Sequence, residues 1–209
     1  MNKKAILIVA LLVNYFLVNA QTSEDDEEKK PFFKKENLFT GGSVNVNFGQ
    51  GTFALGLGPY FGYSINKYVD VAASFNYNYI SQRDPNSTLK YRQSILGPGA
   101  FVRLFPVKSL FVQAQYEYNF IKLKRIYGVA GYPNDVINYK AKSTLIGGGY
   151  CSGREGVGTG FYYFSVLVDV SKDLNSPYRD NFGRQIPIIR AGMNFPLFQG
   201  GGKSKFSDD

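Results

Sequence analysis

Hydrophobic and polar residues alternate with a period of two along most of the chain from Leu38 onward. This period is typical of β-strands with one apolar face and one polar face. Most of the alternating segments are long enough for a tilted strand to cross a membrane, which takes about 9–11 residues. No segment keeps a helical period. The pattern predicts eight strands, at Leu38–Phe48, Phe53–Ile65, Tyr68–Ile80, Lys90–Phe105, Leu110–Lys124, Tyr139–Cys151, Phe161–Lys172 and Ile186–Phe195.

The third segment illustrates the two faces. Apolar and aromatic residues from Val69 to Tyr79 share one face, and small or polar residues from Asp70 to Asn78 share the other. Two kinds of closed barrel have strands of this type. A soluble lipocalin-type barrel turns its apolar face inward, whereas a membrane barrel turns that face to lipid.

The lengths of the connections favour the membrane barrel. Those after the second and fourth segments are short, at Asn66-Lys67 and Pro106–Ser109, whereas those around Arg83–Leu89, Arg125–Asn138 and Asp173–Gln185 are long. Short periplasmic turns and long outer loops are expected of transmembrane barrels. The first outer connection is short and the Gly153–Gly160 turn is long, so these two depart from the pattern.

Aromatic residues gather at both ends of the apolar faces, which is where amphipathic rings meet the two membrane interfaces. The chain has 18 Phe and 16 Tyr residues, which suit strands better than helices. The end with short turns carries Phe61, Tyr63, Tyr162, Phe164 and Phe195, and the end with long loops carries Tyr77, Tyr79, Tyr118 and Phe120.

The start of the chain has the pattern of a secretory signal peptide. Lys3 and Lys4 precede the apolar run Ala5–Val18, and small residues at Val18-Asn19-Ala20 form a cleavage site. We therefore expect a signal peptide at 1–20 and a flexible charged leader at 21–37. The barrel should occupy 38–198, and a polar tail should follow at 199–209.

The last strand places Ile189, Ala191, Met193 and Phe195 on one face and ends near an aromatic residue. Together with the alternating segments, it resembles the small outer-membrane β-barrel proteins of Gram-negative bacteria, the group of the OmpA transmembrane domain and OmpX. The resemblance covers Leu38 to Phe198 and lies in the pattern. It implies an all-β fold, an eight-stranded antiparallel up-and-down transmembrane barrel in the outer membrane. An even number of strands would place both termini in the periplasm.

The chemistry open to the chain is narrow. It has no histidine and a single cysteine, Cys151, which excludes an imidazole base and argues against a zinc site. We expect no enzyme activity, no cofactor and no metal. The interior of an eight-stranded barrel is just filled by side chains, which argues against a solute channel. The formal net charge of +8 favours outer-membrane lipid and lipopolysaccharide as partners, and nucleic acid is not expected.

Isolated charges lie on the polar faces, at Asp70, Arg103, Glu117, Asp169 and Arg190. We interpret the carboxylates as partners of inward arginines, with carboxylate catalysis as the alternative. If Asp173 lies opposite Ile186, the register pairs Asp169 with Arg190, close enough for an interior ion pair. Arg103 and Glu117 are then the remaining interior charges.

Lys122 and Lys124 continue the lipid-facing side of the fifth segment beyond Phe120. They are candidate contacts for lipopolysaccharide phosphates, and snorkelling of lysine to the interface is an equal interpretation. The predicted function is structural or protein interaction, as an accessory subunit of a larger outer-membrane complex. The alternatives are a soluble lipocalin-like ligand-binding barrel and a histidine-free lipid-modifying enzyme.

Overall fold

The computed structural model describes residues 33–49, 52–83, 89–127, 133–179 and 184–198. The predicted signal peptide, most of the charged leader and the C-terminal tail lie outside the described residues. Within these ranges, no helix is long and apolar enough to span a membrane.

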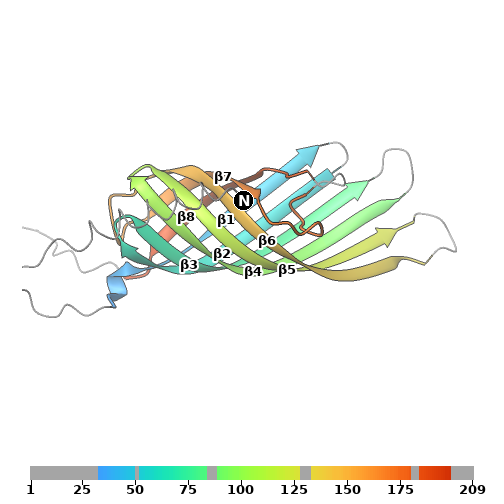
Figure 1. Ribbon diagram of the computed structural model, residues 1–209, viewed down its shortest axis with the longest axis horizontal. Helices are drawn as coiled ribbons and strands as arrows, with labels where there is room; N and C mark the ends of the chain where they lie inside the picture. Colours follow the sequence, from blue (N-terminus) through green and yellow to red (C-terminus); the bar gives the residue numbers. More distant parts are fainter. Residues whose placement is uncertain (1–32, 50–51, 84–88, 128–132, 180–183, 199–209) are drawn as a thin grey trace, which may run out of the picture. The chain divides into compact units, whose positions relative to one another are not determined.

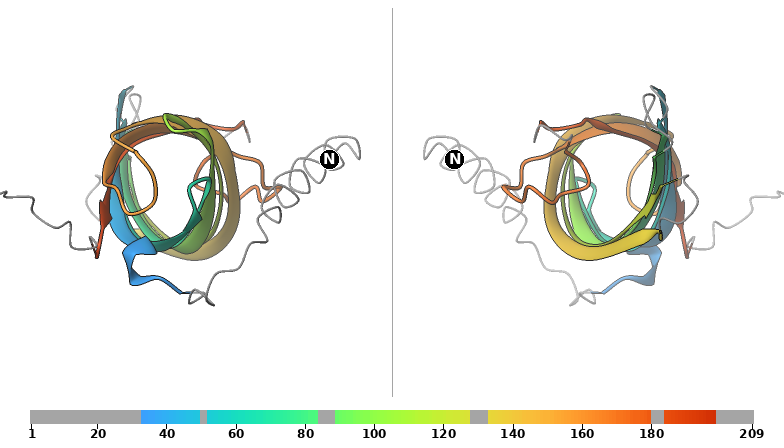
Figure 2. Two further views of the ribbon diagram at one scale, coloured as in Figure 1. Left: turned by 90° about the vertical axis from the view of Figure 1, so that its left-hand side faces the viewer. Right: turned by 90° about the vertical axis from the view of Figure 1, so that its right-hand side faces the viewer.

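The described residues form eight antiparallel strands that follow one another in chain order and close into a barrel (Figures 1 and 2). A short 3-10 turn, η1 (Lys35–Asn37), precedes the first strand. The predicted eight-stranded, antiparallel up-and-down barrel is therefore confirmed. The strands are β1 (Leu38–Gly49), β2 (Thr52–Asn66), β3 (Val69–Arg83), β4 (Lys90–Val107), β5 (Leu110–Ile126), β6 (Asp135–Ser152), β7 (Phe161–Asp169) and β8 (Ile188–Pro196).

The last two strands are shorter than the sequence pattern predicts, and β6 is longer. β7 ends at Asp169 and β8 begins at Ile188, whereas β6 already begins at Asp135. As a result β6 pairs with β7 only from Leu145 to Ser152. β1 likewise pairs with β8 only up to Val44. In Figure 1 the other strands extend to the right beyond β7 and β8.

The two ends of the barrel differ in their connections. Tight turns follow β2 and β4, and residues 153–160 join β6 to β7 at the same end, which we call the turn end. The odd-numbered strands end at the opposite end of the barrel, which we call the loop end. β1 and β8 meet at the turn end, where Phe39 lies opposite Pro196. The barrel thus begins and ends on one side, as an even number of strands requires.

Burial alternates along the strands as the two faces predict. In β3, Asp70, Ser74 and Asn76 are buried, whereas Phe75 and Tyr77 are exposed on the outer surface. Polar groups are therefore enclosed and large apolar groups lie outside, the reverse of a soluble lipocalin-type barrel. This is the architecture of an eight-stranded transmembrane β-barrel.

The enclosed space contains different residues at its two ends. An aromatic cluster fills the turn end, formed by Phe39, Tyr60, Ala72, Phe101, Phe105, Phe111, Cys151, Phe161 and Tyr163. Toward the loop end, smaller aliphatic clusters surround Leu145 and Ile95. Between these regions lies a polar layer that holds the ion pair of Glu117 and Arg190.

Candidate interaction surface and the closed interior

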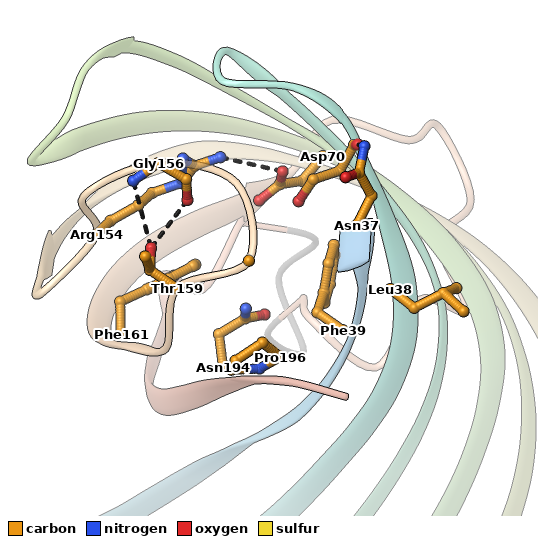
Figure 3. Close-up of a pocket in the computed structure, with 12 residues that line it drawn as sticks. Asn37, Leu38, Phe39, Asp70, Arg154, Gly156, Thr159, Phe161, Asn194 and Pro196 are labelled. Atoms are coloured by element: carbon orange, nitrogen blue, oxygen red, sulfur yellow. Dashed lines mark hydrogen bonds and ion pairs between the residues drawn. The ribbon is translucent and has the colours of Figure 1, made fainter. Parts of the chain in front are cut away.

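The turn end is closed by residues 153–160, the orange turn that lies across the opening in the left view of Figure 2. Gly153 and Gly158 have φ angles of +90° and +75°, which a glycine adopts readily and which allow the turn to fold back. Arg154 then enters the interior, where its Nη2 lies 3.1 Å from Oδ1 of Asp70 (Figure 3). Its guanidinium carbon lies 3.7 Å from the centre of the Phe105 ring. These contacts tie the turn to β3 and β4.

Arg103 lies inside the barrel, as expected, and is surrounded by aromatic rings. Its guanidinium carbon is 4.2 to 5.2 Å from the ring centres of Tyr60, Phe101, Phe111 and Tyr163. Its Nε donates a hydrogen bond of 2.8 Å to Gln113. Such cation–π contacts stabilise a desolvated guanidinium, and Arg103 therefore has a structural role in the core.

Glu117 is the centre of the polar layer. Its side chain is 0% exposed and accepts four hydrogen bonds of 2.6 to 3.1 Å. The donors are Asn76, Gln115, Tyr178 and Arg190. Both carboxylate oxygens of Glu117 therefore accept hydrogen bonds from other side chains of the protein.

The predicted ion pair between Asp169 and Arg190 is wrong. β7 and β8 pair with Ser165 opposite Arg190, so Arg190 instead reaches Glu117, with its Nη2 3.1 Å from Oε1. The expected register assumed that the strands continue to Asp173 and Ile186. β7 ends at Asp169 and β8 begins at Ile188, so the pairing of the two strands does not reach these residues.

Asp169 has a different role, at the point where β7 ends. Its carboxylate accepts hydrogen bonds from the backbone N–H groups of Thr144 and Ser171 and from the Ser171 hydroxyl. The side chain is buried at 0% exposure. Asp169 therefore caps the end of the β6–β7 pairing.

Tyr178, in the described part of the loop between β7 and β8, enters the loop end of the barrel. Tyr178 packs against Leu145, Leu167 and Ile188, and its hydroxyl donates a hydrogen bond of 2.6 Å to Glu117. Burial and the nearby Glu117 carboxylate raise the pKa of the Tyr178 phenol well above its ordinary value. The phenol therefore stays protonated and remains a donor to Glu117.

Little free space remains between these layers. One enclosed cavity lies at the turn end beside Arg154, and another lies between Arg103 and Arg190. Each measures about 10 Å³, which is room for a single water molecule. The described interior is thus packed by side chains, consistent with the expectation for a barrel of eight strands.

The loop end carries two strand edges with no neighbouring strand among the described residues. β6 continues beyond the end of β7, and β1 continues beyond the end of β8. Two carboxylates bind the first free N–H groups of β6. The Thr144 N–H donates to Asp169 at 3.1 Å, and the Lys142 N–H donates to Asp173 at 2.8 Å.

Backbone groups of alternate residues point to the same side of an antiparallel strand. The N–H and C=O groups of Lys140 and Asn138 therefore face the open side, as those of Thr144 and Lys142 do. We call residues 136–142 the β6 edge. No described strand pairs with it, and beyond the Lys142 N–H that binds Asp173 its Lys140 and Asn138 groups could accept a neighbouring strand.

Lys122 and Lys124 lie on the outer surface beside the β6 edge. The register places Arg92 next to Lys124, and Lys140 Nζ lies 5.5 Å from the centre of the Phe120 ring. Lys124 is half-buried and the other cations of this surface are exposed. We call this surface the basic face; its members are Arg92, Lys122, Lys124, Lys140 and Lys142.

Sequence reasoning missed Arg154 and Tyr178, the two residues with which connecting segments close the barrel. Both lie in segments without alternation, where no period indicates the direction of a side chain. A single arginine within the glycine-rich Gly153–Gly160 turn is the signal that could have drawn attention to Arg154. The β6 edge was missed because β6 was expected to begin at Tyr139 and β7 to end at Lys172.

A solved structure of Ail, the attachment invasion locus protein of Yersinia pestis, in complex with the heparin analogue sucrose octasulfate, matches with a TM-score of 0.44 and 9% sequence identity. The match covers 75% of this chain and 92% of that chain. No protein-family model matches this chain, and no curated protein matches it in sequence. The fold assignment stands on the strand order, the register and the burial pattern.

Proposed function

We propose that this chain is a non-enzymatic protein of the outer membrane that binds an extracellular protein. In this complex, an extended strand of the partner pairs with the β6 edge. The apolar outer surface and the enclosed polar groups suit a barrel in lipid. The signal sequence supports export. With both barrel ends at the turn end, the turn end would face the periplasm and the loop end the exterior.

The arrangement of the interior favours a scaffold over an enzyme. Asp70 is bound to Arg154, Glu117 to Arg190 and Asp169 to backbone N–H groups. A general acid or base must reach a substrate proton within hydrogen-bond distance. These carboxylates lie in a packed interior in which their oxygens already accept hydrogen bonds from the protein.

The β6 edge carries the proposal. Free edge N–H and C=O groups readily pair with a strand from another chain, and natural proteins usually cover or interrupt them. Addition of an extended segment to such an edge is a recurring mode of protein recognition. Here the edge stands at the loop end, where an external partner would reach it.

Site-specific photo-crosslinking in intact cells tests this function. A photoreactive residue at Val136, the first residue of the edge, should form an adduct with a partner, and one at Val166 on the outer face of β7 should not. Asn138→Pro removes an edge N–H that β5 does not use, and it should abolish the adduct. The matched variant Asn138→Ala keeps that N–H and should preserve it. An adduct that persists with Asn138→Pro would refute strand addition at this edge.

The basic face supports a second binding role, toward lipopolysaccharide phosphates. Arg92, Lys122 and Lys124 lie beyond Phe120, and Lys140 and Lys142 lie opposite Phe120 and Tyr118 on β6. Lys ammonium groups bind phosphate as point charges. Lys122→Glu with Lys124→Glu should lower the lipopolysaccharide phosphate that co-purifies with the barrel. Lys67→Glu with Lys108→Glu, at the turn end, is the matched control and should leave it unchanged. Equal phosphate content in both double variants would refute phosphate binding and leave snorkelling to the membrane interface as the role of Lys122 and Lys124.

A further inference from the structure

The β6 edge already binds acidic groups from its own chain. The carboxylates of Asp169 and Asp173 take the place of strand carbonyls at the first two free N–H groups. The donor–acceptor distances are 3.1 and 2.8 Å, within the range of normal hydrogen bonds. The next two residues of the edge, Lys140 and Asn138, present the same backbone groups without such a carboxylate among the described residues.

The outward side of the edge is cationic. Lys140 and Lys142 are exposed on it, and Lys122 and Lys124 project from the neighbouring strand on the same surface. A strand added to the β6 edge would continue this surface, with its outward side chains about 4.5–5.5 Å from those of β6, measured between Cβ atoms. Acidic side chains at those positions would pair with the lysines, and basic ones would be repelled.

The inward side of the edge is apolar. Ala141 is buried with Ile95 and Ile121, and Tyr139 packs against the same cluster. Ile137 follows on this side in the alternation and is half-buried. Inward side chains of an added strand would lie beside this cluster, so apolar residues fit there.

From these two sides we infer that the β6 edge selects an extended segment in which acidic residues alternate with apolar residues. The inference rests on the proposed function and adds the sequence class of the partner. The acidic residues would face the lysines on the outward side, and the apolar residues would complete the inward cluster. The partner backbone would pair with the N–H and C=O groups of Lys140 and Asn138.

Peptide binding to the full chain in phosphatidylcholine nanodiscs tests the selection. The probe is a fluorescent peptide of about eight residues, an ordinary strand length, in which Glu alternates with Val. Its matched control has Lys in place of Glu. Anisotropy should show binding of the Glu peptide at least about tenfold tighter, which corresponds to about 1.4 kcal/mol. Lys140→Gln with Lys142→Gln should remove most of this preference.

Two further measurements separate charge from strand pairing. Asn138→Pro should abolish binding of the Glu peptide, and Asn138→Ala should retain it. A Glu peptide with N-methyl groups on alternate backbone nitrogens should also fail to bind, and this result does not depend on how a protein variant folds. N-methylation leaves the charges in place and removes backbone donors.

The outcomes distinguish the inference from the function on which it rests. If both peptides bind equally and both require the Asn138 N–H, strand addition stands and the acidic selection is overturned. If the Glu peptide binds Asn138→Pro and the N-methylated form also binds, charge alone drives binding and both are overturned. If neither peptide binds, both are overturned as well.

Discussion

Replacement of Arg190 by methionine should destabilise the barrel strongly, because Arg190 neutralises a carboxylate that water does not reach. Glu117 is fully buried, and Arg190 Nη2 lies 3.1 Å from its Oε1. Methionine has a comparable length and no charge, so the variant removes the counter-ion with little change in volume. Tyr178, Asn76 and Gln115 would still donate to the carboxylate.

Removal of one partner of a buried ion pair typically costs about 3–5 kcal/mol. Because three donors to Glu117 remain, we expect a loss near the lower end, about 3 kcal/mol in the free energy of unfolding. Glu117→Gln alone would leave the Arg190 guanidinium without its carboxylate and with neutral amide oxygens, such as that of Gln115, as acceptors, and a similar loss is expected. The double variant Glu117→Gln, Arg190→Met removes both charges and should be less destabilised than the two single losses added together.

Urea unfolding in lipid vesicles measures these free energies. The chain has no tryptophan, so circular dichroism and the gel migration of unheated samples are suitable signals. The coupling between Glu117 and Arg190 should exceed about 1 kcal/mol, whereas Asp169→Asn and Arg190→Met should add to within about 0.5 kcal/mol. Additive losses for Glu117 and Arg190 would refute the assigned pair.

Three other predictions follow from the same contacts. Tyr178→Phe removes a hydrogen bond to a charged group, so unfolding free energy should fall by about 1.5–3 kcal/mol and limited proteolysis should cut the β7–β8 loop faster. Arg154→Gln should lower the free energy of unfolding measured in urea. Arg154→Lys should recover only part of this loss, because lysine cannot reproduce a planar guanidinium stacked on an aromatic ring. A tag at Pro133 should be accessible to antibody on intact cells and a tag after Asp209 should not; the reverse result would invert the proposed orientation.

The amino-acid sequence by itself determined the strands and their two faces. A strand alternates its side chains with a period of two, so Asp70, Glu117 and Arg103 could be assigned to one face from their own segments. The alternation of short and long connections indicated which strand ends lie together. These are local properties, and each is readable within about fifteen residues of chain.

Only the tertiary structure decided which interior charges meet and where β7 and β8 end. Arg190 lies 73 residues from Glu117 and Arg154 lies 84 residues from Asp70, and both contacts cross the enclosed space. Partners across a barrel depend on its stagger and closure, which no single segment specifies. Segments without alternation, such as the turn with Arg154 and the loop with Tyr178, fold according to the space and partners the closed barrel offers. The β6 edge exists for the same reason, because the carboxylates of Asp169, at the end of β7, and Asp173, in the following loop, take hydrogen-bond positions that a longer β7 would otherwise fill.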